Sequence, residues 1–253
     1  MKYIAIDTES TFDPYLKEAY ECIDPDQNRA REACRVITAA SAFQFELDEQ
    51  GRVSTGPVAS WTAYDHSEAE ILGRLSNHLI SQPEHSVVTW GGASADLVRL
   101  TLASMANDLP LPGQLRREPS GHRSRQHIDV SAAMTAGTGK YHHLSEVLIR
   151  LGLPVGLLLD KACPLQAHTS TEWDHLRQHC ELDSLFASIA FVAWRRVEGA
   201  PGLRIPEAVY ALIAGYLRQR PGCIGEPMLT SVCSDMAERV AARMAQLVQG
   251  AHA

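Results

Sequence analysis

Residues 4–9 read Ile-Ala-Ile-Asp-Thr-Glu, an apolar run that ends in two carboxylates one residue apart. Residues 2–7 are rich in strand-forming residues, so we predict a buried β-strand there. Residues i and i+2 of a strand project from one face, which places Asp7 beside Glu9, with Ala5 leaving room beneath them. Adjacent carboxylates raise each other's pKa unless a cation lies between them, and a divalent hard cation is the usual one. An Asp-x-Glu triplet alone is weak evidence, but ligands commonly bind where a buried strand ends.

The pattern after Glu9 predicts more strands and then mostly helices. Two antiparallel strands, 36–47 and 53–62, are expected on either side of the turn Asp48-Glu49-Gln50-Gly51. We then expect a helix at 65–82, a strand at 86–90, a helix capped by Ser94 that runs to about Asn107, and a fifth strand at 126–130. Further helices are predicted at 141–151, 171–198, 206–220 and 228–249. This order indicates an α/β or α+β domain.

The break at Gly199-Ala200-Pro201-Gly202 separates the last two helices from the rest. We therefore predict a domain over residues 1–199 and a C-terminal helical extension over residues 200–253. The extension carries an apolar stripe that includes Val232, Met236 and Val240. Such a stripe can pack on the domain or form a contact between copies of the chain, so a homo-oligomer through these helices is one expectation.

Composition and charge restrict the class of protein. The chain has 253 residues, of which 45% are hydrophobic and 21% charged, as in an ordinary globular protein. It contains no apolar run near the ~20 residues of a membrane helix and begins with no signal peptide, so we expect no membrane partner and a cytoplasmic location. The six cysteines form no Cys-x-x-Cys pair, which argues against a zinc ribbon or a disulfide framework.

A net charge of −7 is unfavourable for a nucleic-acid binder, because phosphate neutralisation needs basic surface. Acids that bind divalent cations would reverse the sign locally. One basic stretch is also present in a predicted loop, and it is equally well interpreted as a phosphate contact or as a solvated loop. It consists of Arg116, Arg117, His122, Arg123, Arg125 and His127.

Asp183 is the second acid that stands out. It falls within an apolar stripe of the predicted helix 171–198, formed by Leu176, Cys180, Ala187, Ala190 and Trp194. An unpaired buried carboxylate costs several kcal/mol, so Asp183 should have a charged partner or a metal, unless the stripe faces a groove and leaves it solvated or paired to an arginine. His179 lies one turn earlier on nearly the same face. Asp96 follows the predicted strand 86–90, and taken alone it is ordinary helix-dipole chemistry.

Together these acids occur in an order that resembles the DEDD (DnaQ-like) 3′–5′ exonucleases, and most closely the predicted exonucleases related to the proofreading domain of B-family DNA polymerases. The resemblance covers roughly residues 1–199. The segments that carry it are Ile4 to Glu9, Val87 to Gly92 with Asp96-Leu97, His127-Ile128-Asp129-Val130, Leu144 to Pro154, and His179 to Asp183.

The resemblance implies a ribonuclease H-like fold, with a mixed five-stranded central sheet flanked by helices. It implies metal-dependent hydrolysis of single-stranded DNA or RNA from 3′ ends, with release of nucleoside 5′-monophosphates. Two Mg²⁺ or Mn²⁺ ions would be bound by four acids, and His179 would orient or deprotonate the attacking water. The acids are Asp7, Glu9, Asp96 and Asp183. The candidates for contacts with nucleic acid are Thr8, Gly92, Arg123 and Arg125.

The chain departs from the family pattern at three places. His179 lies four residues before Asp183, the spacing of the tyrosine-type members, whereas histidine-type members place histidine five residues before and this chain has Gln178 there. Gly91 and Ala95 replace an Asn and an aromatic residue that shape the substrate path. Val155-Gly156 replaces the usual Gly-Lys.

Two other functions remain open from the sequence. The chain could be a catalytically weak ribonuclease H-like module that binds nucleic acid or assembles through residues 200–253, which the changes at Gly91 and Ala95 favour. It could also be a nuclease of another polarity or target, such as a structure-specific endonuclease.

Overall fold

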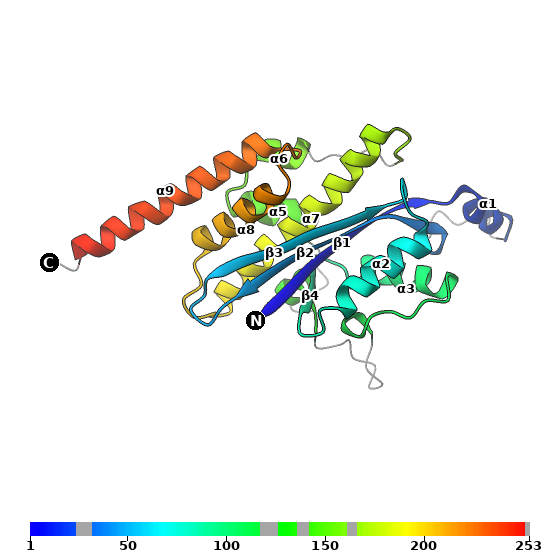
Figure 1. The fold of residues 1–253 in the computed structure, drawn as a ribbon, viewed down its shortest axis with the longest axis horizontal. Helices are drawn as coiled ribbons and strands as arrows, with labels where there is room; N and C mark the ends of the chain where they lie inside the picture. The colour runs from blue at the N-terminus through cyan, green and yellow to red at the C-terminus, as the bar shows by residue number, and fades with distance from the viewer. Residues whose placement is uncertain (24–31, 117–125, 136–141, 161–165, 251–253) are drawn as a thin grey trace.

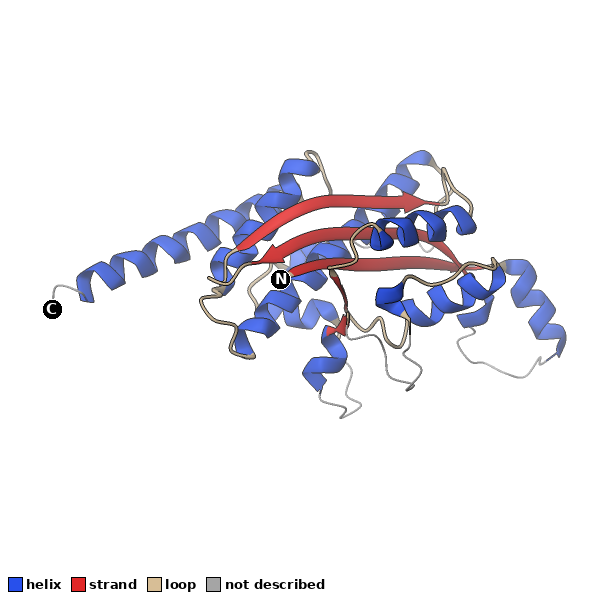
Figure 2. Ribbon diagram, turned by 60° about the horizontal axis from the view of Figure 1, so that its bottom comes forward, coloured by secondary structure: helices blue, strands red, loops and turns tan. Residues whose placement is uncertain are grey.

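A mixed five-stranded sheet forms the centre of the molecule, with strand order β3-β2-β1-β4-β5 (Figures 1 and 2). The computed structural model describes residues 1–23, 32–116, 126–135, 142–160 and 166–250. β1 pairs antiparallel with β2 and parallel with β4, β2 pairs antiparallel with β3, and β4 pairs parallel with β5. The strands are β1 Lys2–Phe12, β2 Arg35–Leu47, β3 Val53–Thr62, β4 Ser86–Thr89 and β5 His127–Asp129. The predicted mixed sheet is confirmed, and the fold is ribonuclease H-like.

Helices cover both faces of this sheet (Figure 2). The helices are α1 Pro14–Ile23, α2 Glu68–Ile80, α3 Asp96–Ala106, α4 Val130–Thr135, α5 Leu144–Arg150, α6 Val155–Asp160, α7 Ser170–Val197, α8 Ile205–Gln219 and α9 Glu226–Gly250. Two short 3₁₀ turns lie at Glu32–Cys34 and Gly113–Leu115. Ile4 and Ile6 of β1 pack with α2 and α3 in one apolar core. Tyr3 and Ala5 point the other way, into the core formed with α7, α8 and part of α9.

Three details of the sequence interpretation need correction. β1 does not end near Asp7 but continues to Phe12, because β2 pairs with it over this whole length. Ser94 does not cap α3; the cap position is Ala95, without a side-chain hydrogen bond, and the Ser94 hydroxyl donates to the carbonyl of Gly91. Three helices, α1, α4 and α6, were not predicted. α1 lies in a segment taken as polar, and none of its residues is buried.

The two C-terminal helices differ in how they contact the sheet. Val209, Leu212 and Ile213 of α8 are buried in the same core as α7. Gln219, at the end of α8, closes the outer edge of β3: its Oε1 accepts from the Val58 N–H and its Nε2 donates to the Gly56 carbonyl. α9 begins on the domain and runs away from it toward the C-terminus (Figure 1). The division at residue 200 and the homo-oligomer stay predictions.

None of the described helices combines the length and apolarity needed to cross a membrane.

Glu181 is a fully buried carboxylate that joins three elements. On β3, Ser60 donates to its Oε1 at 2.5 Å. Arg177, one turn earlier on α7, donates to Oε1 at 2.7 Å, and Arg220, just after α8, donates to both oxygens at 2.8 and 3.0 Å. A buried carboxylate is tolerated only when it is paired in this way, so Glu181 fixes α8 against α7 and β3.

Replacement of Arg220 by alanine should therefore destabilise the protein. Glu181 keeps Arg177 but loses two charge-assisted hydrogen bonds, and we expect the free energy of unfolding in urea to fall by about 2–3 kcal/mol. Arg218→Ala, at an exposed position near the end of α8, should change it by less than about 0.5 kcal/mol. Equal effects of the two substitutions would contradict the role given to Glu181.

Candidate metal centre

Asp7 and Glu9 lie where β1 extends beyond its parallel neighbour. The pairing of β1 with β4 reaches Ala5, opposite Val88, while the pairing with β2 continues through both acids. A β-bulge follows directly after Glu9. The two carboxylates alternate with Thr8 and therefore project from the α7 side of the sheet. They lie beside the carboxyl end of β4, the edge at which ligands bind in α/β folds.

α7 brings His179 and Asp183 to these carboxylates. From Cys180 to Ala193, every residue of this helix except Asp183 is buried. The Cys180 thiol donates to the carbonyl of Asp7 at 3.3 Å, which fixes the helix against β1 at this level. His179 Nε2 lies 2.9 Å from Glu9 Oε1 and 3.3 Å from Asp183 Oδ2. One donor atom of each of these three residues lies within 4.8 Å of the other two, so these residues could hold a metal ion together; Asp7 and Asp96 are not part of this group.

Asp96 approaches from the other side, as the first residue of α3. Its side chain is buried, and the Thr8 hydroxyl donates to its Oδ1 at 2.7 Å. Thr8 alternates with the acids on β1 and points toward α3, so it holds Asp96 next to the strand that carries Asp7. Its hydroxyl is buried in this contact. Its expected contact with nucleic acid stays a prediction.

The surroundings of Asp7 disfavour an unpaired negative charge on its carboxylate. Burial raises the pKa of Asp7 well above its ordinary range, and the negative charges of Glu9, Asp183 and Asp96 raise it further. Among the described residues, Asp7 Oδ2 is buried without a hydrogen-bond partner. Such an atom costs about 1–3 kcal/mol. A cation shared with the neighbouring acids would remove this cost, so the residues fit a divalent metal.

Burial also raises the pKa of Asp96, to about 6, against the lowering effect of the Thr8 hydrogen bond and the Arg99 charge. Arg99 lies one turn along α3 and donates to Glu32 Oε2 at 2.7 Å. The positive charge of Arg99 lowers the pKa of Asp96. Its hydrogen bond to Glu32 also links α3 to the turn before β2. Arg123 and Arg125, the predicted nucleic-acid contacts of the basic stretch, lie outside the described residues.

Asp129 organises the loop that leads to Asp96, a role that the sequence interpretation missed. Its carboxylate accepts from the N–H groups of Gly91 at 2.9 Å and Ala93 at 2.8 Å, and from Ala132 in α4 at 3.1 Å. An aspartate between a short strand and a helix is a signal for such capping.

Glycine occurs at positions 91 and 92 of this loop for two different physical reasons. Gly91 has a φ of +67°, a conformation that glycine adopts without strain. A Cβ on Gly92 would lie 2.5 Å from the Thr89 hydroxyl, so glycine is required there for packing. The predicted contact of Gly92 with nucleic acid stays a prediction.

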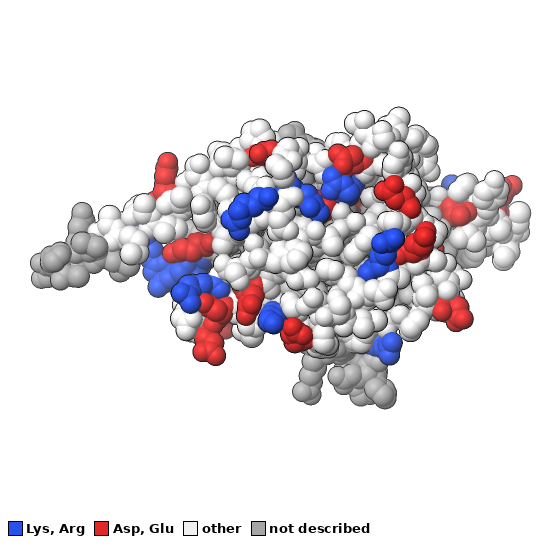
Figure 3. All heavy atoms as spheres, viewed as in Figure 1, with Lys and Arg blue, Asp and Glu red and all other residues white. Residues whose placement is uncertain are grey.

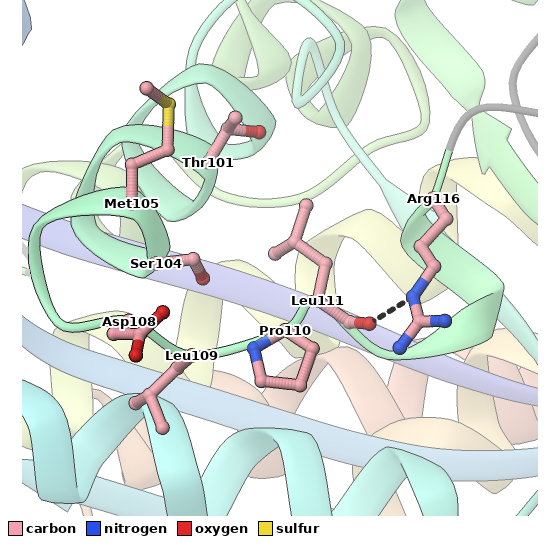
Figure 4. A pocket seen from close by; sticks show the side chains of 8 residues that line it. All are labelled: Thr101, Ser104, Met105, Asp108, Leu109, Pro110, Leu111 and Arg116. Atoms are coloured by element: carbon pink, nitrogen blue, oxygen red, sulfur yellow. Dashed lines mark hydrogen bonds between the residues drawn. The ribbon is translucent and has the colours of Figure 1, made fainter.

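A groove of about 500 Å³ lies between α3 and the segment that follows it (Figure 4). Thr101 and Met105 of α3 line it together with Leu109 to Leu111, and Arg116 closes one end by donating to the Leu111 carbonyl. None of the four acids lines it. The face shown in Figure 3 carries basic and acidic side chains interspersed, without a large area of one sign among the described residues.

No family model and no curated protein matches the sequence. Among solved structures, the chain is similar to the family B DNA polymerase of the hyperthermophilic archaeon Pyrobaculum calidifontis, with 13% identity and a TM-score of 0.52. The match covers 87% of this chain and 29% of the polymerase, so this chain corresponds to less than a third of that protein. The zinc-bound E. coli ExoI–ssDNA complex matches with 13% identity and a TM-score of 0.40, over 83% of this chain and 42% of that one. The likeness to the polymerase supports the ribonuclease H-like fold.

The raised pKa values predict how stability depends on pH without metal. Protonated Asp7 and Asp96 stabilise the fold fully below their ordinary pKa of 3.8, and this contribution is lost as pH rises through the higher folded values. Asp7→Asn mimics the protonated form, so it should raise the melting temperature of metal-free protein at pH 7.5 and have little effect at pH 4. We expect at least the 2–4 °C that about 1 kcal/mol gives in a chain of this size.

The same measurement with Mn²⁺ serves as its control. Mn²⁺ should stabilise the wild type at pH 7.5 and stabilise Asp7→Asn much less, because binding to the folded state raises stability by mass action. If Asp7→Asn instead destabilises the metal-free protein at pH 7.5, the negative charge of Asp7 does not carry the electrostatic cost assigned to it.

Proposed function

We propose that the protein is a metal-dependent 3′–5′ exonuclease that hydrolyses single-stranded DNA or RNA and releases nucleoside 5′-monophosphates. The observation that supports it most is the buried Asp7 Oδ2, which has no hydrogen-bond partner in the described part of the chain. The charges of Glu9, Asp96 and Asp183 act on the same carboxylate. Along the chain, these acids occur in the order that the family resemblance implies.

Each residue has a part in the proposed reaction. Asp7, whose carboxylate is affected by the charges of the other three acids, would help to hold two divalent cations, one together with Glu9 and Asp183 and the other together with Asp96. Bound Mg²⁺ or Mn²⁺ would supply an activated water and charge stabilisation for the leaving 3′-oxygen. Thr8 positions Asp96. His179 faces the same carboxylates, and it either takes the proton of the attacking water, as the resemblance implies, or binds a cation through Nε2.

A cavity near the end of β1, which none of the four acids lines, offers a place for the terminal nucleotide. It has a volume of about 290 Å³ and lies between Thr11–Pro14, just after Glu9 on the chain, and Trp173 and Leu176 near the start of α7. Phe12 and Trp173 line it, and aromatic side chains bind single-stranded bases by stacking without regard to sequence. We propose that the 3′-terminal base enters here.

The proposal predicts metal-dependent shortening of a 5′-labelled oligonucleotide from its 3′ end. Asp7→Ala should lower the rate by about 10³-fold or more, since the bound ions are worth several kcal/mol in the transition state. Asp235→Ala, which removes an exposed acid on α9, should retain the wild-type rate. DNA and RNA substrates should both be tested in Mg²⁺ and in Mn²⁺.

A second substrate with a blocked 3′ end tests the polarity. An exonuclease of this polarity should leave it intact, whereas an endonuclease would still cut it. Equal inertness of the wild type and Asp7→Ala on all substrates would instead favour a binding module.

A further inference from the structure

The position of His179 points to a role that differs from that of a general base. We propose that its Nε2 is itself a metal ligand, so that Glu9, His179 and Asp183 form a mixed nitrogen–oxygen site that favours Mn²⁺ and other first-row transition ions over Mg²⁺. The inference rests on the proposed function, since it concerns one of the two ions of that centre.

The distances around Nε2 are those of neighbouring ligands on one ion. Metal–ligand bonds from imidazole nitrogen and carboxylate oxygen are about 2.0–2.2 Å, so two ligands at a right angle on one ion lie about 3 Å apart. His179 Nε2 lies 2.9 Å from Glu9 Oε1 and 3.3 Å from Asp183 Oδ2. A shared cation can therefore bind all three atoms with little movement of the side chains.

The sequence of α7 explains why the nitrogen faces this place. His179 is four residues before Asp183, and i, i+4 side chains lie one above the other on a helix. A residue five before Asp183 points elsewhere, and this is where Gln178 lies. Its amide donates to Asp174 Oδ2 at 2.7 Å and accepts from the Ile224 N–H at 2.6 Å. Gln178 is thus committed to structure, and the imidazole of His179 is the nitrogen donor that α7 presents to the acids.

Ligand chemistry then sets the preference among metals. Mg²⁺ requires oxygen ligands in near-ideal octahedral geometry and gives up its waters reluctantly, whereas imidazole suits transition ions. A neutral imidazole that coordinates through Nε2 keeps its proton on Nδ1 and has no further lone pair at Nε2. His179 in this role binds the cation and takes no proton from water.

Mn²⁺ alone is a suitable probe, because it is paramagnetic. Pulsed electron paramagnetic resonance of the Mn²⁺-loaded full chain should show electron-spin-echo modulation from a directly bound histidine ¹⁴N. His179→Gln should lose this modulation, because the amide offers an oxygen ligand in place of the ring nitrogen. His175→Gln, one turn earlier on α7, should retain it. Labelling with ¹⁵N-histidine should replace the ¹⁴N pattern with the ¹⁵N one in both the wild type and His175→Gln.

Titration provides the second measurement. His179→Gln should lower the ratio of Mn²⁺ affinity to Mg²⁺ affinity by about tenfold or more. Loss of even an outer-shell partner lowers metal affinity by about tenfold, and His179 would be a direct ligand. Mn²⁺ bound at the centre without histidine modulation, or an unchanged ratio in His179→Gln, would overturn the inference and leave the exonuclease proposal standing. No Mn²⁺ binding that depends on Asp7 would overturn both.

Discussion

The repulsion between the Asp7 carboxylate and its three acidic neighbours is the constraint on which the site depends. Three other acids raise the pKa of Asp7, and its Oδ2 is buried without a hydrogen-bond partner among the described residues. Net protein stability is only about 5–15 kcal/mol, so such a cluster carries a considerable cost, which a bound cation would remove. The long pairing of β1 with β2 keeps Asp7 and Glu9 in place when β4 has already ended.

Packing and hydrogen bonds around the acids hold them in place against that repulsion. α7 is buried almost completely around Asp183, its Cys180 thiol contacts the Asp7 carbonyl, and Glu181 ties the same turn to β3 and to Arg220. On the other side, Asp129 fixes the loop before Asp96 through backbone N–H groups. α8 packs in the same apolar core as α7 and the sheet, and it thereby stabilises the position of α7. The C-terminal part of the chain thus contributes to the rigidity of the helix that carries His179 and Asp183.

Sequence patterns predicted the parts of this structure that local physics decides. Alternation and turn residues located all five strands, and Asp183 stood out because a carboxylate on an apolar helix needs a partner. The extension of β1 to Phe12 was missed because it depends on pairing with distant β2, and α1 was missed because it buries none of its residues. The contacts of Asp129 with Gly91 and Ala93, and of His179 with Glu9, depend on tertiary placement. They could be found only once the strands and α7 were assembled.

The central claim is that these acids hold two divalent cations. The most direct measurement is anomalous diffraction from crystals of the protein soaked in Mn²⁺. The account predicts two peaks about 3.5–4 Å apart, the separation typical of two-metal sites, bounded by Asp7, Glu9, Asp96 and Asp183. Crystals of Asp7→Asn should lose at least one of them. Mn²⁺ peaks only elsewhere on the surface, with the four acids unliganded, would contradict the account.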